Sequence, residues 1–178
     1  YGILVKAAVE ENADFIISGA GLPLDLPKYL SPGSRTKLIP VVSSARALQV
    51  ICKRWARFNK QPDAVIVEGP LAGGHLGYSH DSVNGENSEK LEDIIKGVIE
   101  FANTCEPRIP VIAAGGIFDG ADIAHFLKLG ASGVQMATRF VCTTECDAHD
   151  NFKQAYINAK EEDITIIKSP VGLPGRVI

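Results

Sequence analysis

Features that mark several protein classes are missing from this 178-residue chain. No apolar run reaches the ~18 residues that a membrane-spanning helix requires. Basic residues are not in excess either: 18 Lys and Arg stand against 21 Asp and Glu, a formal net charge of −3. The hydrophobic fraction of 46% is enough for a packed core. We therefore expect a globular protein that binds neither membranes nor nucleic acid.

Paired cysteine motifs are also lacking. The four cysteines are Cys52, Cys105, Cys142 and Cys146, and no two of them are separated by two residues. This spacing gives no secreted disulfide framework, which predicts reduced thiols and a cytoplasmic protein. Cys142 and Cys146, followed by His149, are the nearest approach to metal-ligand spacing, but zinc sites need four ligands at tighter spacing. We expect no metal site.

The most informative segment present is residues 65–77. A short apolar run, typical of a buried strand, ends at Glu68 and is followed by the small-residue cluster Gly-Pro-Leu-Ala-Gly-Gly-His. Glycines such as Gly73 and Gly74 let backbone N–H groups approach a ligand closely. His75, at the strand end, is suited to proton transfer. A purely structural turn remains an alternative for this segment.

A second glycine-rich strand end follows in Ile-Ala-Ala-Gly-Gly-Ile, residues 112–117. Gly115 and Gly116 turn the chain, and Asp119 is a good N-cap for a helix that Gly130 ends. Unpaired N–H groups and the positive end of this helix would face the same point, which favours an anion site.

The next predicted strand, residues 133–136, also ends in small and polar residues, through Ala137 and Thr138. Two successive strand ends of this kind match the phosphate-binding corner of a (β/α)₈ barrel, which forms after strands seven and eight. The alternative is a pair of ordinary βα turns.

Five strand–helix units are visible along the chain. The predicted strands are Asp14–Ser18, Leu38–Val42, Ala64–Glu68, Ile109–Ala114 and Gly133–Met136. The predicted helices are Ile3–Glu11, Ala45–Asn59, Glu89–Asn103, Ala121–Leu129 and Asp150–Lys160. In the second helix, Leu48, Ile51, Trp55 and Phe58 form an apolar stripe that we expect to face the core.

The three motifs together resemble the nitronate monooxygenase family, also called 2-nitropropane dioxygenases, to which the flavin-dependent enoyl-ACP reductases are close. The resemblance covers Glu-Gly-Pro-Leu-Ala-Gly-Gly-His (68–75), Pro-Val-Ile-Ala-Ala-Gly-Gly-Ile (110–117) and Gln-Met-Ala-Thr-Arg-Phe (135–140). It extends from Phe-Ile-Ile-Ser-Gly-Ala-Gly (15–21) to Ser-Pro-Val-Gly-Leu-Pro-Gly-Arg (169–176).

The resemblance implies an α/β fold, a TIM barrel that binds FMN. A complete barrel takes about 250 residues, so we interpret residues 1–178 as one domain, a fragment with the last five of eight βα units. A free-standing open sheet of five parallel strands is the alternative, and it would expose an edge. Such an edge would favour a homo-oligomer.

The resemblance also assigns residues. His75 matches the catalytic histidine, as a base or as the group that orients the substrate. The residues implied to hold FMN are Glu68, Gly73, Gly74, Gly115, Gly116, Gln135, Met136, Ala137 and Thr138. Relatives often carry Glu at Leu71 and Gly at Ala137, so the wall beside His75 is more apolar here.

Three functions stay open. The first is FMN-dependent oxidation of alkyl nitronates by O₂, and the second is reduction of enoyl thioesters with NAD(P)H. The chain has no Gly-x-Gly-x-x-Gly fingerprint, but barrel flavoenzymes need none. The third is a barrel remnant that no longer binds flavin.

Overall fold

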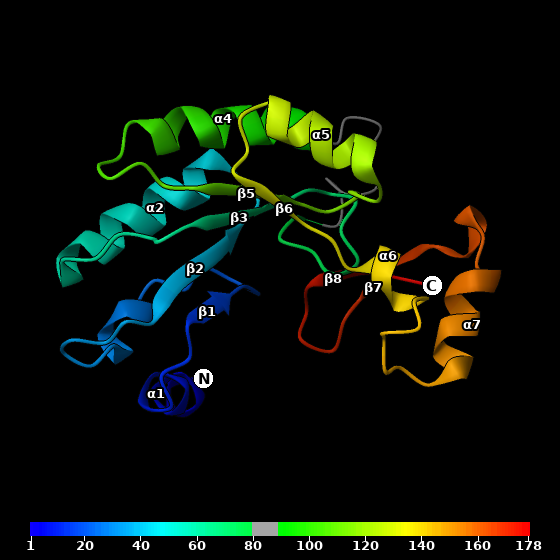
Figure 1. Cartoon of the computed structure of the whole chain (residues 1–178), viewed down its shortest axis with the longest axis horizontal. Helices are drawn as coiled ribbons and strands as arrows, with labels where there is room; N and C mark the ends of the chain where they lie inside the picture. Colours follow the sequence, from blue (N-terminus) through cyan, green and yellow to red (C-terminus); the bar gives the residue numbers. More distant parts are fainter. Residues whose placement is uncertain (80–88) are drawn as a thin grey trace.

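The computed structural model describes residues 1–79 and 89–178, and its largest element is a parallel sheet (Figure 1). The sheet contains β1 (Phe15–Ser18), β2 (Lys37–Val42), β3 (Val65–Glu68), β5 (Val111–Ala114) and β6 (Gly133–Gln135). Its strands lie side by side in the order of the sequence and all pair in parallel. This sequential order, without a reversal, is that of an arc of a barrel rather than of a doubly wound sheet.

Helices connect the strands and line one side of the sheet. They are α1 (Gly2–Glu10), α2 (Ala45–Trp55), α4 (Leu91–Asn103) and α5 (Gly120–Lys128). In Figure 1, α2, α4 and α5 lie next to one another along the same side of the strands. A helix crossing over between parallel strands covers a sheet face in this way because a short turn cannot join such strands.

The two faces of the sheet have separate apolar clusters. Val65, Val67 and Val111 face the helices and belong to the main core, where Trp55 is fully buried. Ile66, on the opposite face, packs in a smaller cluster with Ile39 and Ala114. Because both faces are covered in the middle of the sheet, these strands are continuous apolar runs rather than alternating ones.

The first strand differs, because its second face is open. Phe15 and Ile17 are 62% and 56% exposed. Ile17 aligns with Ile39 of β2, so both side chains lie on the face that would be the inside of a barrel. The exposed edge expected for an incomplete barrel is thus present at β1.

All five predicted strands and the five predicted helices occur, with boundaries shifted by a few residues. One prediction for α2 is wrong. The helix ends at Trp55 rather than Asn59, and Phe58 lies in a following 3₁₀ turn, where it is 36% exposed instead of facing the core. The tighter turn changes the angular spacing of side chains and takes Phe58 off the buried stripe.

The remaining elements form a second, antiparallel sheet and its surroundings, which the sequence patterns did not indicate. The sheet has the order β4 (Gly74–His75), β8 (Pro174–Val177) and β7 (Thr165–Lys168). Before it in sequence come α6 (Thr138–Val141) and α7 (Asp150–Asn158). In Figure 1 these elements lie beyond the end of the parallel sheet, together with the C-terminus.

No helix within residues 1–79 and 89–178 has both the length and the apolar character needed to cross a membrane.

Candidate functional site

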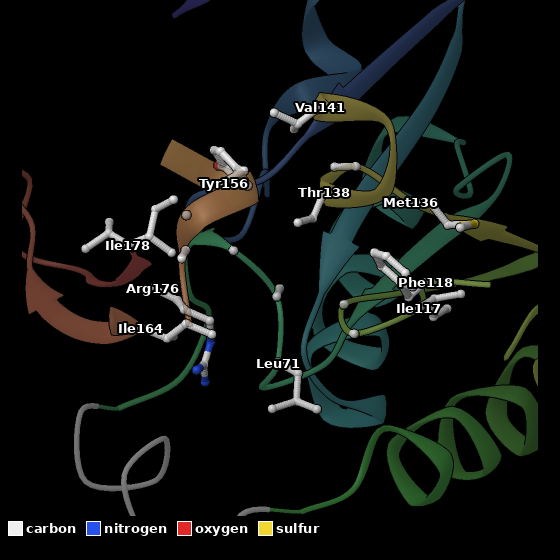
Figure 2. Close-up of a pocket in the computed structure, with 18 of the residues that line it drawn as sticks. Leu71, Ile117, Phe118, Met136, Thr138, Val141, Tyr156, Ile164, Arg176 and Ile178 are labelled. Carbon is white, nitrogen blue, oxygen red and sulfur yellow. The ribbon is translucent and has the colours of Figure 1, made fainter. Parts of the chain in front are cut away.

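A cavity of about 670 Å³ lies between the carboxyl ends of the parallel strands and the C-terminal elements (Figure 2). Its volume is within the range of small-molecule and cofactor sites. Nine lining residues are those that the sequence predicted for cofactor binding: Glu68, Gly73, Gly74, Gly115, Gly116, Gln135, Met136, Ala137 and Thr138. The fold therefore brings three separate sequence motifs to one cavity.

Strand register explains this convergence. Glu68 aligns with Ala114, and Ala114 aligns with Gln135. Aligned residues of parallel strands project to the same face, so Glu68 and Gln135 belong to one row. This row is at the carboxyl edge of the sheet, and the loops that follow it form the cavity wall.

Gly115 and Gly116 form the turn after β5, and only glycine suits either position. Their φ angles are +92° and +80°, in the left-handed region. A Cβ on Gly115 would lie 3.0 Å from the Gly69 carbonyl oxygen, and a Cβ on Gly116 would lie 3.0 Å from Leu71 Cβ. The glycine pair thus lets this turn pack directly against the loop that follows β3.

The anion site predicted at the start of α5 is only partly available. Asp119 accepts hydrogen bonds from the N–H groups of Ala121 and Asp122, and the Asp122 carboxylate accepts from those of Phe118 and Asp119. Asp119 is confirmed as the N-cap, but its capping box already occupies the first-turn donors.

Free backbone donors remain in the turn between β5 and α5 and just before α6. Within the described residues, the N–H groups of Gly115, Gly116 and Ala137 have no hydrogen-bond acceptor. All three residues line the cavity. Unpaired backbone N–H groups of this kind can bind an anion, so the available donors at this end of the sheet are in the Gly-Gly turn and at the start of α6 rather than in α5.

Glu68 is half-buried where β3 enters the cavity. Burial raises the pKa of its carboxyl group, because a charged carboxylate loses hydration there. The Tyr78 hydroxyl donates to the Glu68 backbone carbonyl at 2.7 Å. Burial together with the neighbouring Glu68 charge raises the pKa of Tyr78. A half-buried carboxyl group with a raised pKa is thus present in the cavity wall.

His75 lies beside the cavity but does not line it. It pairs with Gly175 in β4–β8, while Gly74 pairs with Arg176. Opposed residues of an antiparallel pair share a face and successive residues alternate. Since Arg176 lines the cavity, the exposed His75 projects from the other face of this small sheet. The His75 side chain therefore lies on the opposite side of β4 from the cavity and its nine predicted cofactor-binding residues.

Arg176 is a cavity residue that the sequence analysis missed as a candidate. Its Nη2 donates to the Pro70 carbonyl at 2.9 Å, and its buried Nε has no partner among the described residues. Figure 2 shows its side chain on the wall between Ile164 and Leu71. The motif that contains Arg176 was noted only as part of a resemblance, because no local pattern predicts pairing over 106 residues.

The wall contributed by the C-terminal region was missed as well. It includes Val141, Tyr156, Ala159, Lys160, Glu161, Ile164, Val177 and Ile178. Five of these are large apolar or aromatic side chains on or next to short elements, a pattern that is not distinguishable from ordinary surface in the sequence. The C-terminal wall consequently combines apolar side chains with the charged Lys160, Glu161 and Arg176, whereas the other wall contributes most of the glycines.

Two polar residues near the cavity motifs have structural roles. The Arg139 guanidinium packs over the Phe118 ring at 4.9 Å. His149 caps α7 by accepting a hydrogen bond from the Asn151 N–H. A third polar residue, His80, lies outside the described residues. Within the described ranges, no group of three or more His, Cys, Asp or Glu side chains is arranged to hold a metal ion.

Comparison with curated proteins identifies relatives that are longer than this chain. The chain is 32% identical over 141 residues to a Rhodococcus jostii (3aS,4S,5R,7aS)-5-hydroxy-7a-methyl-1-oxo-octahydro-1H-indene-4-carboxyl-CoA dehydrogenase, covering 79% of this chain and 34% of that protein. It is 37% identical over 116 residues to a Staphylococcus aureus protein named Probable nitronate monooxygenase, covering 65% and 31%. The chain therefore spans about a third of the length of these relatives.

Two solved structures are similar over nearly the whole chain. FabK from Thermotoga maritima is 35% identical with a TM-score of 0.76, and the match covers 98% of this chain and 49% of FabK. A nitroalkane oxidase from Streptomyces ansochromogenes is 25% identical with a TM-score of 0.77, covering 97% and 47%. The parallel sheet thus corresponds to about half of larger, TIM-barrel-like proteins. The sequence profile of the nitronate monooxygenase family matches residues 2–178, and this chain belongs to that family of oxidoreductases.

Proposed function

We propose that residues 1–178 form a single unit, five of the eight βα units of an FMN-dependent barrel that oxidises alkyl nitronates with O₂. The family supplies the reaction class, and its members generally use FMN and act on small molecules. The identity of the substrate rests on the resemblance of the three motifs. Because the chain spans only part of the length of its relatives, their activity is extended to this chain as part of the proposal.

The observation that carries the proposal is the convergence of unpaired backbone donors on one cavity. Gly115, Gly116 and Ala137 come from two loops, yet all three line the same cavity, and their N–H groups have no acceptor in residues 1–79 and 89–178. A phosphate has several acceptor oxygens and matches such a set of donors. Thr138 can add its hydroxyl group. These donors fit the phosphate of FMN.

The rest of the cavity fits the remainder of this cofactor. Gly73 has open space where a Cβ would be, so a ligand can approach its backbone. Gln135 and Glu68 provide polar side chains on the sheet edge, and Met136 provides an apolar one. When bound, FMN would supply a two-electron acceptor that O₂ can reoxidise.

The residues of this chain have distinct roles in the proposed reaction. Glu68, whose pKa burial raises, retains its proton to a higher pH than an exposed glutamate and places a polar carboxyl group at the cavity wall. His75 projects from the other face of the small antiparallel sheet, so its role in orienting the anionic nitronate or accepting its proton requires that the substrate reach that face. Leu71, 66% exposed, makes the wall near this approach apolar and favours an alkyl substituent on the nitronate.

The first experiment measures flavin binding and oxygen consumption. The purified protein is incubated with FMN, desalted, and examined by visible absorbance; oxygen uptake is then recorded with a small alkyl nitronate. Retained flavin bands and nitronate-dependent uptake are expected. A protein that stays colourless after reconstitution would instead support the third function, a barrel remnant without flavin.

Reduction of enoyl thioesters is the second candidate. The FabK enoyl-ACP reductase has the higher sequence identity of the two solved neighbours, 35% against 25%. In that case His75 would polarise the thioester carbonyl by donating a hydrogen bond. Flavin bands with NAD(P)H oxidation and no nitronate-dependent oxygen uptake would favour this reaction.

Replacing His75 tests its role in either reaction. In His75→Ala we expect turnover to fall by roughly 10² or more, as for loss of a general acid or base, with FMN affinity unchanged. His75→Gln, which keeps a hydrogen-bonding group, is the matched variant. Unchanged turnover in both would remove His75 from the mechanism.

A further inference from the structure

Two cysteines that are distant in sequence meet on the outer side of the sheet. Cys52 lies on α2, and Cys105 follows the end of α4. The two helices belong to successive strand–helix units and lie alongside each other (Figure 1). They approach closely, because a Cβ on Gly97 of α4 would lie 3.9 Å from the Cβ of Ala45 at the start of α2.

The helix repeat then brings the thiols to the same level. Both helices follow strands of the same direction and advance by about 1.5 Å per residue. Seven residues beyond the Ala45–Gly97 contact, α2 reaches Cys52, and the α4 chain reaches its C-cap Thr104 beside Cys105. Helix packing, rather than any local motif, therefore creates this pair.

The two side chains are also neighbours. After burial, the Cys105 thiol is the next cause that raises the pKa of the Cys52 thiol, which places the two groups near each other. The Cys105 Sγ donates to the Phe101 carbonyl at 3.7 Å. Both cysteines pack against the main core and are partly buried. Neighbouring helices thus hold the two free thiols close to one another.

We propose that Cys52 and Cys105 are a redox-sensitive pair that forms a disulfide between α2 and the end of α4 when the protein meets a peroxide. Joining the sulfurs at about 2.05 Å requires the two neighbouring side chains to approach each other within the packed pair of helices. The proposal is independent of flavin binding and of the reaction at the cavity.

The chemistry takes two steps. The Cys105 thiol gives up its proton and its sulfur attacks one peroxide oxygen; the O–O bond breaks, a sulfenic acid forms, and the departing oxygen takes up the released proton and leaves as water. The Cys52 sulfur then attacks the Cys105 sulfur, the S–OH bond breaks, and the Cys52 proton leaves with the hydroxide as a second water. Two thiols are oxidised by two electrons, and one hydrogen peroxide is reduced.

The order of these steps follows from burial. Burial, with Cys105 as a neighbour, raises the pKa of the Cys52 thiol to about 12, so Cys52 is protonated at neutral pH and does not react first. Cys52 acts as the resolving group because its partner is already within contact. The crosslink would then enclose residues 52–105, including β3 and β4, which border the cavity.

The experiment treats the protein with hydrogen peroxide under non-reducing conditions and counts the thiols that can still be alkylated. We expect the count to fall from the four thiols of the sequence to two. Tryptic mapping should give one crosslinked product that joins residues 47–53 to residues 97–108. Reduction with dithiothreitol should restore all four thiols.

The chain supplies its own control in Cys142 and Cys146, four residues apart near α6, where the Cys142 thiol donates to the Lys153 carbonyl. A Cys142→Ser/Cys146→Ser variant should still form the crosslink, and its melting temperature should rise by roughly 5–10 °C on oxidation. Cys52→Ser and Cys105→Ser should show neither effect. A crosslink only between residues 142 and 146, only between separate chains, or none in the wild-type protein would overturn the proposal.

Discussion

The parallel sheet with its helices and the C-terminal region after β6 are built in different ways. In the first, helices cover one face, and nearly all fully buried large side chains belong to it. In the second, only Ser169 and Gly175 are buried among the residues that follow Ala131. Phe152 and Ile157 of α7 are 52% and 58% exposed. The first region has a core of its own, whereas the second does not.

This difference explains where a ligand would have its largest effect. The cavity lies between the two regions, with glycine-rich loops on one wall and α7 and β8 on the other. Backbone pairing of β4 with β8 and the Arg176–Pro70 hydrogen bond are the main links across it. A cofactor contacting both walls would stabilise the C-terminal region preferentially, since ligand binding adds free energy only to the state that binds it.

The largest effect is expected in the core of the parallel region. Trp55 is fully buried, and its indole N–H donates to the Pro23 carbonyl at 2.9 Å. We expect Trp55→Ala to lower the free energy of unfolding by about 3–5 kcal/mol, because it leaves a cavity and an unpaired carbonyl. Urea unfolding followed by circular dichroism measures this change.

Phe152→Ala is the matched aromatic truncation in the C-terminal region. Phe152 contacts Tyr156 but is half exposed, so its loss should cost less than about 1 kcal/mol. Equal destabilisation by the two variants would show that the contrast between the regions is mistaken.

A substitution in the Gly115–Gly116 turn, which lies between the two regions, tests the structure of the cavity wall. Gly116→Val would place a branched side chain at a φ of +80°, with its Cβ 3.0 Å from Leu71 Cβ. Strain of about 1–3 kcal/mol is expected, together with displacement of the Gly115–Gly116 donors, so FMN affinity should fall at least about tenfold. Fluorescence titration of FMN measures the affinity. Gly133→Ala, where open space surrounds the added methyl group, should leave affinity unchanged.

The contrast between the regions also separates what the sequence could predict from what it could not. The apolar runs of β3 and β5 are local signals, and parallel strand order then places Glu68 and Gln135 in one row, on either side of Ala114. The antiparallel sheet depends on residues 74–75 meeting residues 174–177, a pairing with no local signature. The resemblance of the motifs implied the nine cavity residues on the strand side. Arg176 was omitted, and the side-chain direction of His75 could not be derived, because both depend on the long-range pairing.

Arg176 tests the link between the regions. Arg176→Met keeps most of the apolar stem but loses the hydrogen bond to the Pro70 carbonyl. We expect a loss of about 1–2 kcal/mol and faster hydrogen exchange at the Leu76 amide, which donates to Pro174. Exchange at Val65, which donates to Pro110 inside the parallel sheet, should not change. Equal acceleration at both amides would mean that the two regions unfold as one unit.

The smallest effect, and the one with the clearest sign, concerns two carboxyl groups near the cavity. Burial raises the pKa of Glu68 above its ordinary value of 4.5, whereas hydrogen bonds from the Phe118 and Asp119 N–H groups lower that of Asp122 below 3.8. Folding therefore binds a proton at Glu68 and releases one at Asp122 as each titrates.

The two groups should consequently give opposite pH dependence. The cost of burying a charged Glu68 is absent below pH 4.5 and becomes complete as the pH rises through the raised folded pKa. Glu68→Gln should thus gain stability relative to wild type over this interval, by at most about 1 kcal/mol after solvent screening.

The stabilisation from Asp122 is complete above pH 3.8 and is lost as the pH falls through the lowered folded pKa, so Asp122→Asn should be destabilised most near neutral pH. Urea unfolding of both variants from pH 3 to pH 7 measures the differences. If the difference in unfolding free energy from wild type changed with pH in the same direction for both variants, Glu68 would be hydrated in the folded protein. Its side chain would then face open solvent rather than the cavity wall.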